Sequence, residues 1–74
     1  MNIKYEIHNL SNDPANTKLR IIKQKDTICD IYEEDLYECL NDNQIKQWEK
    51  GVYEFTTLPI AKLKEKAIRI FNPC

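Results

Sequence analysis

The fold is decided by residues 26–42, which read DTICDIYEEDLYECLND. Seven carboxylates lie in this stretch, and it contains neither Lys nor Arg. On a helical wheel its apolar side chains fall within an arc of about 120°, which is typical of an amphipathic helix. The residues of this arc are Ile28, Cys29, Tyr32, Leu36, Cys39 and Leu40. The periodicity therefore predicts one central helix over residues 26–42.

Both ends of the stretch carry signals that support this helix. Asp26 or Thr27 can accept a hydrogen bond from a free backbone N–H of the first turn. Carboxylates near the start also complement the positive end of the helix dipole. At the other end, Asn41 and Asn43 favour a turn over continued helix.

The side of this helix opposite the apolar arc is predicted to be acidic and exposed. It comprises Asp30, Glu33, Glu34, Tyr37 and Glu38. Like charges at i and i+4 cost roughly 0.3 kcal/mol each in an isolated helix, and no basic residue of the stretch relieves them. One interpretation is a solvated face that keeps the protein soluble. The other is a surface that binds a basic partner, with Tyr37 as an anchor.

The residues before this stretch predict a β-hairpin. Residues 2–8 alternate, with Ile3, Tyr5 and Ile7 on one side, as in a half-buried strand. Residues 9–16, NLSNDPAN, are rich in turn formers and predict a loop. Residues 17–24, TKLRIIKQ, predict a second strand antiparallel to the first, with a short helix as the alternative.

The residues after the acidic stretch begin with a short helix. Residues 43–50, NQIKQWEK, predict a helix of about two turns that Gly51 ends. We expect Trp48 to fill the core, with a binding platform as the alternative. Residues 52–56 can form a third strand.

The C-terminal segment allows two structures. Thr57 and Pro59 are typical of a helix entry, and the apolar spacing that follows predicts a helix over about 59–70. Residues 67–71 also suit a closing strand. The predicted fold class is α+β, with one domain over residues 1–74. A small antiparallel sheet packs against two or three helices.

Charge is segregated along the chain. Removing the seven negative charges of residues 26–42 from the net charge of −1 leaves +6 on the remainder. Separate acidic and basic poles would steer a charged partner, and in a homodimer the two poles would meet. The N-terminus, MNIKYEIHN, lacks the apolar core of a signal peptide, and no apolar run has transmembrane length. We therefore expect a cytoplasmic protein with no membrane partner.

The sequence lacks the residue patterns of most catalytic and metal sites. His8 is the single histidine and is expected to be structural or solvent-facing, and no two cysteines have zinc-site spacing. A calcium loop is missing, and one glycine excludes a glycine-rich phosphate loop. Cys29 and Cys39 are expected to be buried and unpaired, ten residues apart on one helix, whereas Cys74 is expected to be exposed. We expect no enzyme activity, no metal and no cofactor.

Residues 33–51 are similar to helix-turn-helix repressor domains of the lambda-repressor-like class. The similarity rests on EEDLYECL and NQIKQWEKG, followed by an amphipathic segment. It implies that the second helix is a recognition helix, whose outward polar residues would be Gln44, Lys46, Gln47 and Lys50. The preceding helix, which would cross a phosphate backbone, is the most acidic part of the chain. This alternative function, nucleic-acid binding, would use Lys46, Lys50, Lys62, Lys66 and Arg69.

The leading hypothesis is a small non-catalytic protein-binding module, an adaptor or inhibitor of the kind that phages and mobile elements encode. The acidic face of the central helix would bind a protein with a basic surface. If that surface normally holds nucleic acid, the carboxylates would compete as a mimic of phosphate charge.

Overall fold

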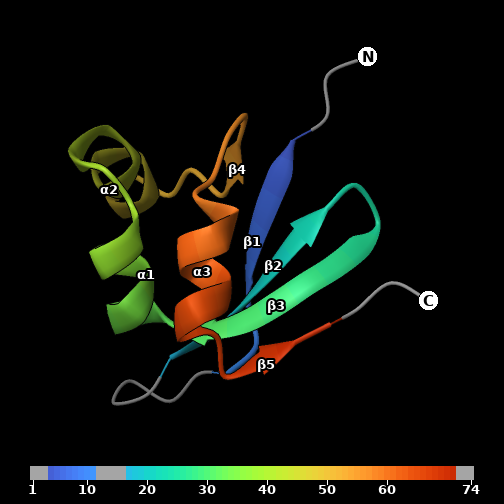
Figure 1. The fold of residues 1–74 in the computed structure, drawn as a ribbon. Coiled ribbons are helices and arrows are strands. Elements are labelled where there is room, and N and C mark those ends of the chain that lie inside the picture. Colours follow the sequence, from blue (N-terminus) through green and yellow to red (C-terminus); the bar gives the residue numbers. More distant parts are fainter. Residues whose placement is uncertain (1–3, 12–16, 72–74) are drawn as a thin grey trace.

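The computed structural model describes residues 4–11 and 17–71, and these form a small α+β fold (Figure 1). The elements are β1 (Tyr5–Asn9), β2 (Lys18–Lys23), β3 (Asp26–Tyr32), α1 (Glu33–Cys39), α2 (Asp42–Glu49), β4 (Glu54–Phe55), α3 (Ile60–Lys66) and β5 (Arg69–Ile70). The strands form one sheet in the order β4-β1-β2-β3-β5, and every neighbouring pair is antiparallel. The predicted fold class and the N-terminal hairpin are confirmed.

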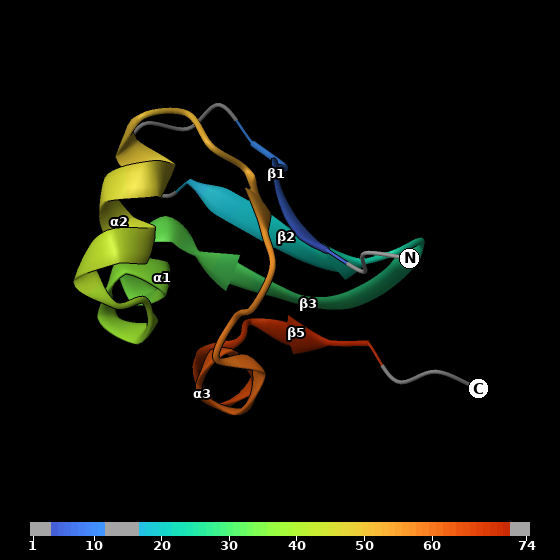
Figure 2. The same ribbon diagram turned by 90° about the horizontal axis from the view of Figure 1, so that it is seen from above.

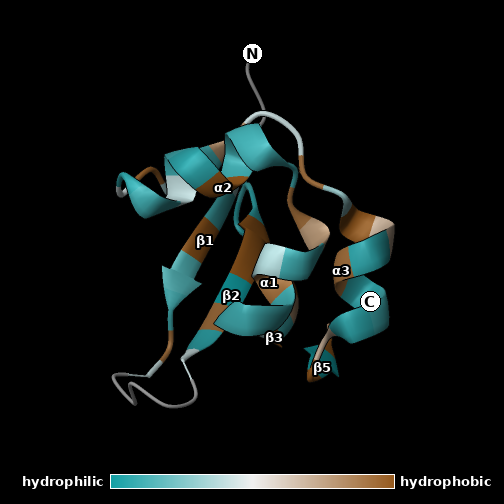
Figure 3. Cartoon of the chain, turned by 90° about the vertical axis from the view of Figure 1, so that its left-hand side faces the viewer, coloured by the Kyte–Doolittle hydropathy of each residue, from teal (hydrophilic) through white to brown (hydrophobic). Residues whose placement is uncertain are grey.

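The helices cover one face of the sheet, as the two perpendicular views show (Figures 1 and 2). Alternate residues of the central strands point into the layer between sheet and helices. The side chains with at most 2% exposure are Ile7, Leu19, Ile21, Cys29, Ile31, Leu36 and Leu63. Hydropathy follows the same division, because the apolar positions of β1 and β2 lie beneath polar outer surfaces of the helices (Figure 3).

The prediction of one helix over residues 26–42 is wrong for its first seven residues. Residues 26–32 form β3, which pairs with β2 from Asp26 to Tyr32 with one register shift at Ile28, and helix α1 starts only at Glu33. Ile31 explains the difference, because it lies outside the helical apolar arc and yet is fully buried beside Cys29 in the strand pattern. A strand buries both side chains on one face, whereas a helix would expose Ile31 to water.

The turn between β2 and β3 carries no glycine. Gln24 adopts a φ of 59°, which is uncommon for a residue with a Cβ. The hairpin therefore forms without the Asn-Gly or Asp-Gly pair that usually marks such turns.

Helix α2 matches its prediction closely. Asn41 accepts a hydrogen bond from the Gln44 backbone at 2.8 Å, and the Gln44 side chain accepts from the Asn41 backbone at 3.2 Å. This reciprocal capping box satisfies two otherwise free N–H groups. Gly51 follows the helix with a φ of 95°, which confirms the expected position of the glycine.

The C-terminal segment combines both predicted structures. Helix α3 ends at Lys66, so the predicted extension to about residue 70 is wrong. β5 then pairs with β3, and the Ile68 backbone donates to the Asp30 carbonyl at 2.7 Å. The third strand predicted over 52–56 is present only as Glu54–Phe55.

Cys29 and Cys39 are both buried and free, as predicted, although they do not share a helix. Burial and the nearby Asp30 carboxylate raise the pKa of the Cys29 thiol to about 11. Burial also raises the pKa of Cys39. Cys74 lies outside the described residues.

Among the helices of the described residues, none has the length and apolar character needed to cross a membrane.

We predict that Ile21→Ala destabilises the protein far more than Ile22→Ala does. Ile21 is fully buried, whereas its neighbour points to the other face of the sheet and is only half-buried. Truncating the buried isoleucine should cost about 2–5 kcal/mol in the free energy of unfolding, measured by urea denaturation. Equal losses for the two variants would contradict the observed strand register.

Candidate functional site

The five residues predicted as an acidic binding face do not form one surface. Asp30 belongs to β3, is only 8% exposed, and accepts from Arg20 Nε at 2.9 Å and from Arg20 Nη2 at 3.2 Å. The other four lie on α1. Asp30 is therefore neutralised within the fold and is separated from the remaining carboxylates.

The acidic residues of α1 differ in their surroundings. Glu38 pairs with Lys66 of α3 at 2.9 Å. Glu34 is exposed, and no described cation forms an ion pair with it. Glu33 and Tyr37 are half-buried, and both face a hollow that the sequence did not reveal.

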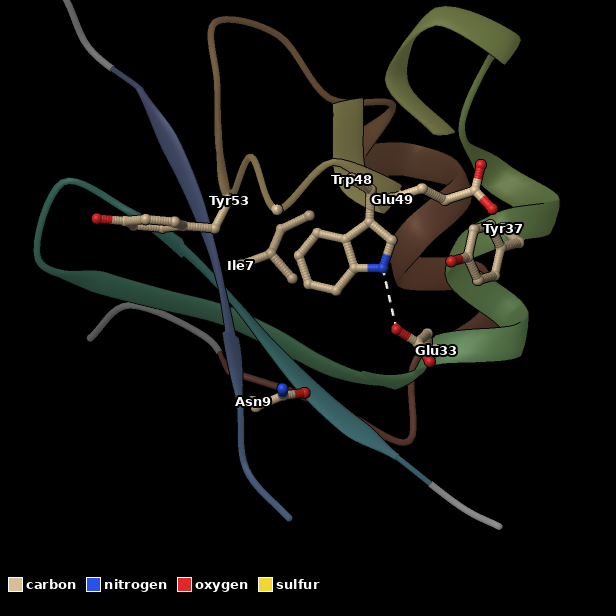
Figure 4. A pocket seen from close by; sticks show the side chains of 8 residues that line it. Ile7, Asn9, Glu33, Tyr37, Trp48, Glu49 and Tyr53 are labelled. Atoms are coloured by element: carbon tan, nitrogen blue, oxygen red, sulfur yellow. Dashed lines mark hydrogen bonds between the residues drawn. The ribbon is translucent and has the colours of Figure 1, made fainter. Parts of the chain in front are cut away.

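This hollow is a pocket of about 560 Å³ between β1, α1, α2 and the segment that leads into β4 (Figure 4). The described residues that line it are Ile7, Asn9, Glu33, Tyr37, Trp48, Glu49, Gly51 and Tyr53. Two of these are carboxylates, three are aromatic and none is basic. We call this the Trp48 pocket.

A hydrogen bond fixes the orientation of the tryptophan in the pocket. The Trp48 indole Nε1–H donates to Glu33 Oε2 at 3.0 Å, which joins α2 to the first turn of α1 (Figure 4). The indole also packs against the core, so the prediction of a core tryptophan is confirmed in part. Its remaining surface lines the pocket. Trp48 is therefore both a packing residue and a rigid aromatic wall.

The charged residues that line the pocket, among those described, are both acidic. Partial burial and the negative charges of Glu33 and Glu49 raise the pKa of the Tyr37 phenol. Both carboxylates act on this phenol, and both line the pocket, one from α1 and one from α2. Among the described side chains, only the Trp48 indole donates to either carboxylate. The arrangement can therefore accept a cation.

Tyr53 contributes to the rim of the pocket rather than to its centre. Its ring points away from Trp48, on the other side of β1 (Figure 4). It contacts the His8 ring with centroids 5.9 Å apart, and His8 in turn lies 3.2 Å from Glu6. Within the described part of the chain, no group of three or more His, Cys, Asp or Glu side chains could hold a metal ion.

The basic residues of the alternative prediction are spread over three elements. Lys46 and Lys50 belong to α2 and its C-cap, and Lys62 and Lys66 belong to α3. Arg69 belongs to β5, where its guanidinium lies 4.8 Å from the centre of the Phe71 ring. Arg20 lies over the same ring at 5.2 Å. The structure therefore brings together Arg20, Arg69 and Phe71, and only Arg69 of these was predicted.

We predict that removing either pocket carboxylate lowers the pKa of Tyr37. In Glu33→Gln and Glu49→Gln, one of the negative charges that disfavour the phenolate is lost. NMR titration of ¹³C-labelled tyrosine resolves this phenol from the other three tyrosines. The matched control is Glu38→Gln, whose carboxylate pairs with Lys66. An unchanged pKa of Tyr37 in both pocket variants would contradict the described geometry.

Comparison with known proteins assigns the chain to no family. No family model matches it, and neither a curated protein nor a solved structure does so.

Proposed function

We propose that this chain is a small non-catalytic protein-binding module that receives a basic segment of its partner at the Trp48 pocket. The observation that supports this is the meeting of two carboxylates with the rings of Tyr37 and Trp48 in one pocket, whose described lining residues include no basic one. Positive charge on the partner would be favoured there by electrostatic complementarity and by the aromatic faces.

A protein partner fits the surroundings of the pocket better than a free ion does. The exposed apolar side chains Leu10 and Val52 adjoin the lining residues Asn9 and Gly51 in the chain, and Tyr53 itself is 49% exposed. A standard interface covers about 800 Å² on each partner. Of the total surface of 5379 Å², such an interface would occupy roughly a seventh. The pocket would be its centre, and these apolar residues with Glu34 would form its rim.

The bound partner surface would be one that carries Lys and Arg. Negative charge near the pocket would speed association more than it would deepen affinity. Where the partner uses the same basic surface for nucleic acid, occupation by this chain would block that use. The proposed role is therefore an adaptor or an inhibitor.

We expect reversal of the two pocket carboxylates to release the partner. A tagged Glu33→Lys/Glu49→Lys variant should retrieve less of the partner from the source cell than the unaltered chain does, because two attractions become repulsions. Asp26→Lys/Glu65→Lys is the control, since it changes the net charge equally at exposed positions outside the pocket. Circular dichroism confirms that both variants fold. An identical set of captured proteins for both variants would refute the assigned surface.

A second candidate function is nucleic-acid binding, and the cluster of Arg20, Arg69 and Phe71 favours it. Arg69 forms no ion pair with a described residue, so its guanidinium is available to a phosphate. Asp30 already neutralises Arg20, which weakens this candidate relative to the first.

The second candidate predicts binding that weakens steeply as salt rises. Fluorescence anisotropy with labelled single-stranded and duplex DNA measures this, and Arg69→Ala should reduce the affinity more than the control Lys25→Ala. Lack of binding at low salt would eliminate this function.

A further inference from the structure

We propose that the Trp48 pocket binds the side chain of an arginine residue in the partner polypeptide. The guanidinium would stack on the Trp48 ring and donate hydrogen bonds to Glu33 and Glu49. This inference rests on the proposed function and assigns the chemical group that the pocket recognises.

The tryptophan is held in place by a hydrogen bond and contributes to the lining of the pocket. Its only polar atom, Nε1, is already engaged by Glu33 at 3.0 Å. The edge of the indole is thereby fixed, and the ring extends from Glu33 towards Ile7 (Figure 4). A fixed indole face is the strongest cation–π partner among the aromatic side chains. A ligand would therefore meet a prepared surface and would not have to order it.

The two carboxylates provide acceptors on two different elements. Glu33 stands in the first turn of α1, and Glu49 is the last residue of α2. Glu33 uses one oxygen for the indole, and no described residue donates to its other oxygen or to Glu49. Several acceptor positions thus remain around the aromatic walls.

Arginine satisfies these requirements together, whereas lysine satisfies them only in part. A guanidinium is planar and carries five N–H donors in its plane, so it can stack on a ring and donate to separate carboxylates at once. The ammonium group of lysine is a compact charge that is more strongly hydrated. A pocket of about 560 Å³ is also within the usual range for a bound side chain or small ligand.

The chain itself contains the same arrangement on its sheet. Arg20 donates to Asp30 at 2.9 and 3.2 Å while its guanidinium lies 5.2 Å from the centre of the Phe71 ring. One carboxylate, one aromatic ring and one guanidinium therefore already form a stable group within this fold. The Trp48 pocket presents the carboxylates and the ring without the guanidinium.

Short blocked peptides test this assignment directly. Trp48 is the only tryptophan, so its fluorescence and its indole N–H signal in NMR report on the pocket alone. The probes are acetyl-Gly-Arg-Gly-amide, the same peptide with lysine, and the same peptide with citrulline, which has a similar shape and no charge. The arginine peptide should change the Trp48 signals saturably and bind roughly threefold to tenfold more tightly than the lysine peptide. The citrulline peptide should leave the signals unchanged.

Variants of the chain link the response to the pocket. Glu33→Gln keeps an acceptor for the indole and removes the charge, so it and Glu49→Gln should each weaken the arginine peptide roughly threefold to tenfold. Glu38→Gln, which removes a carboxylate that pairs with Lys66, should leave the affinity unchanged. Equal effects of the three variants would overturn the assignment, because they would indicate general attraction by net charge.

Failure of this inference differs from failure of the proposed function. If the arginine peptide leaves Trp48 unperturbed while the partner is still captured in a Glu33- and Glu49-dependent manner, the arginine assignment is overturned and the binding function stands. Binding of lysine as tightly as arginine overturns the assignment as well. If the arginine peptide binds but no captured protein depends on the two carboxylates, the pocket assignment stands and the proposed function fails.

Discussion

The ion pair between Arg20 and Asp30 joins the middle of β2 to the middle of β3. Asp30 is the buried charge among the described residues, and burying a carboxylate without a partner would cost several kcal/mol. The two hydrogen bonds from Arg20 satisfy it and match the strand register that places these residues opposite each other. A slip of one strand by one residue would break the pair and turn the apolar side chains of that strand away from the helices.

The architecture was predictable from the sequence where periodicity was unambiguous, as in β1 and α2. Residues 26–32 satisfied a helical and a strand pattern at once, because Cys29 is buried in either structure. The β-branched residues Thr27, Ile28 and Ile31 were the signal for a strand. No hairpin-turn motif preceded this strand, since the turn at Gln24 contains no glycine. Continuous acidity across residues 26–42 concealed the boundary at Glu33, although carboxylates in a first helical turn are themselves a start signal.

The candidate site was predictable only in fragments. Glu33 and Tyr37 were identified from the acidic side of the predicted helix, whereas Glu49 was not, and for Trp48 a place in the core was preferred over a binding platform. The lining comes from β1, α1, α2 and the chain before β4. Proximity between such segments depends on how α2 turns back across β1, which no local pattern specifies. Asp30 shows the opposite case. It was grouped with Glu33 because of its charge, yet it is buried in the sheet layer, whereas Glu33 lies in the helix layer.

The sheet ends in two very short strands, β4 and β5, each with two paired residues. A longer exposed strand at either edge of the sheet would present a row of unpaired backbone N–H and C=O groups. Another polypeptide could pair with these groups as an additional strand, which is a common route to fibrils. In this sheet each edge strand has only two residues, and Arg69 places a charge on the edge strand β5. Each edge strand therefore offers only a short template for pairing with another chain. Under the proposed function, the partner would therefore be recognised through side chains rather than through added backbone pairing.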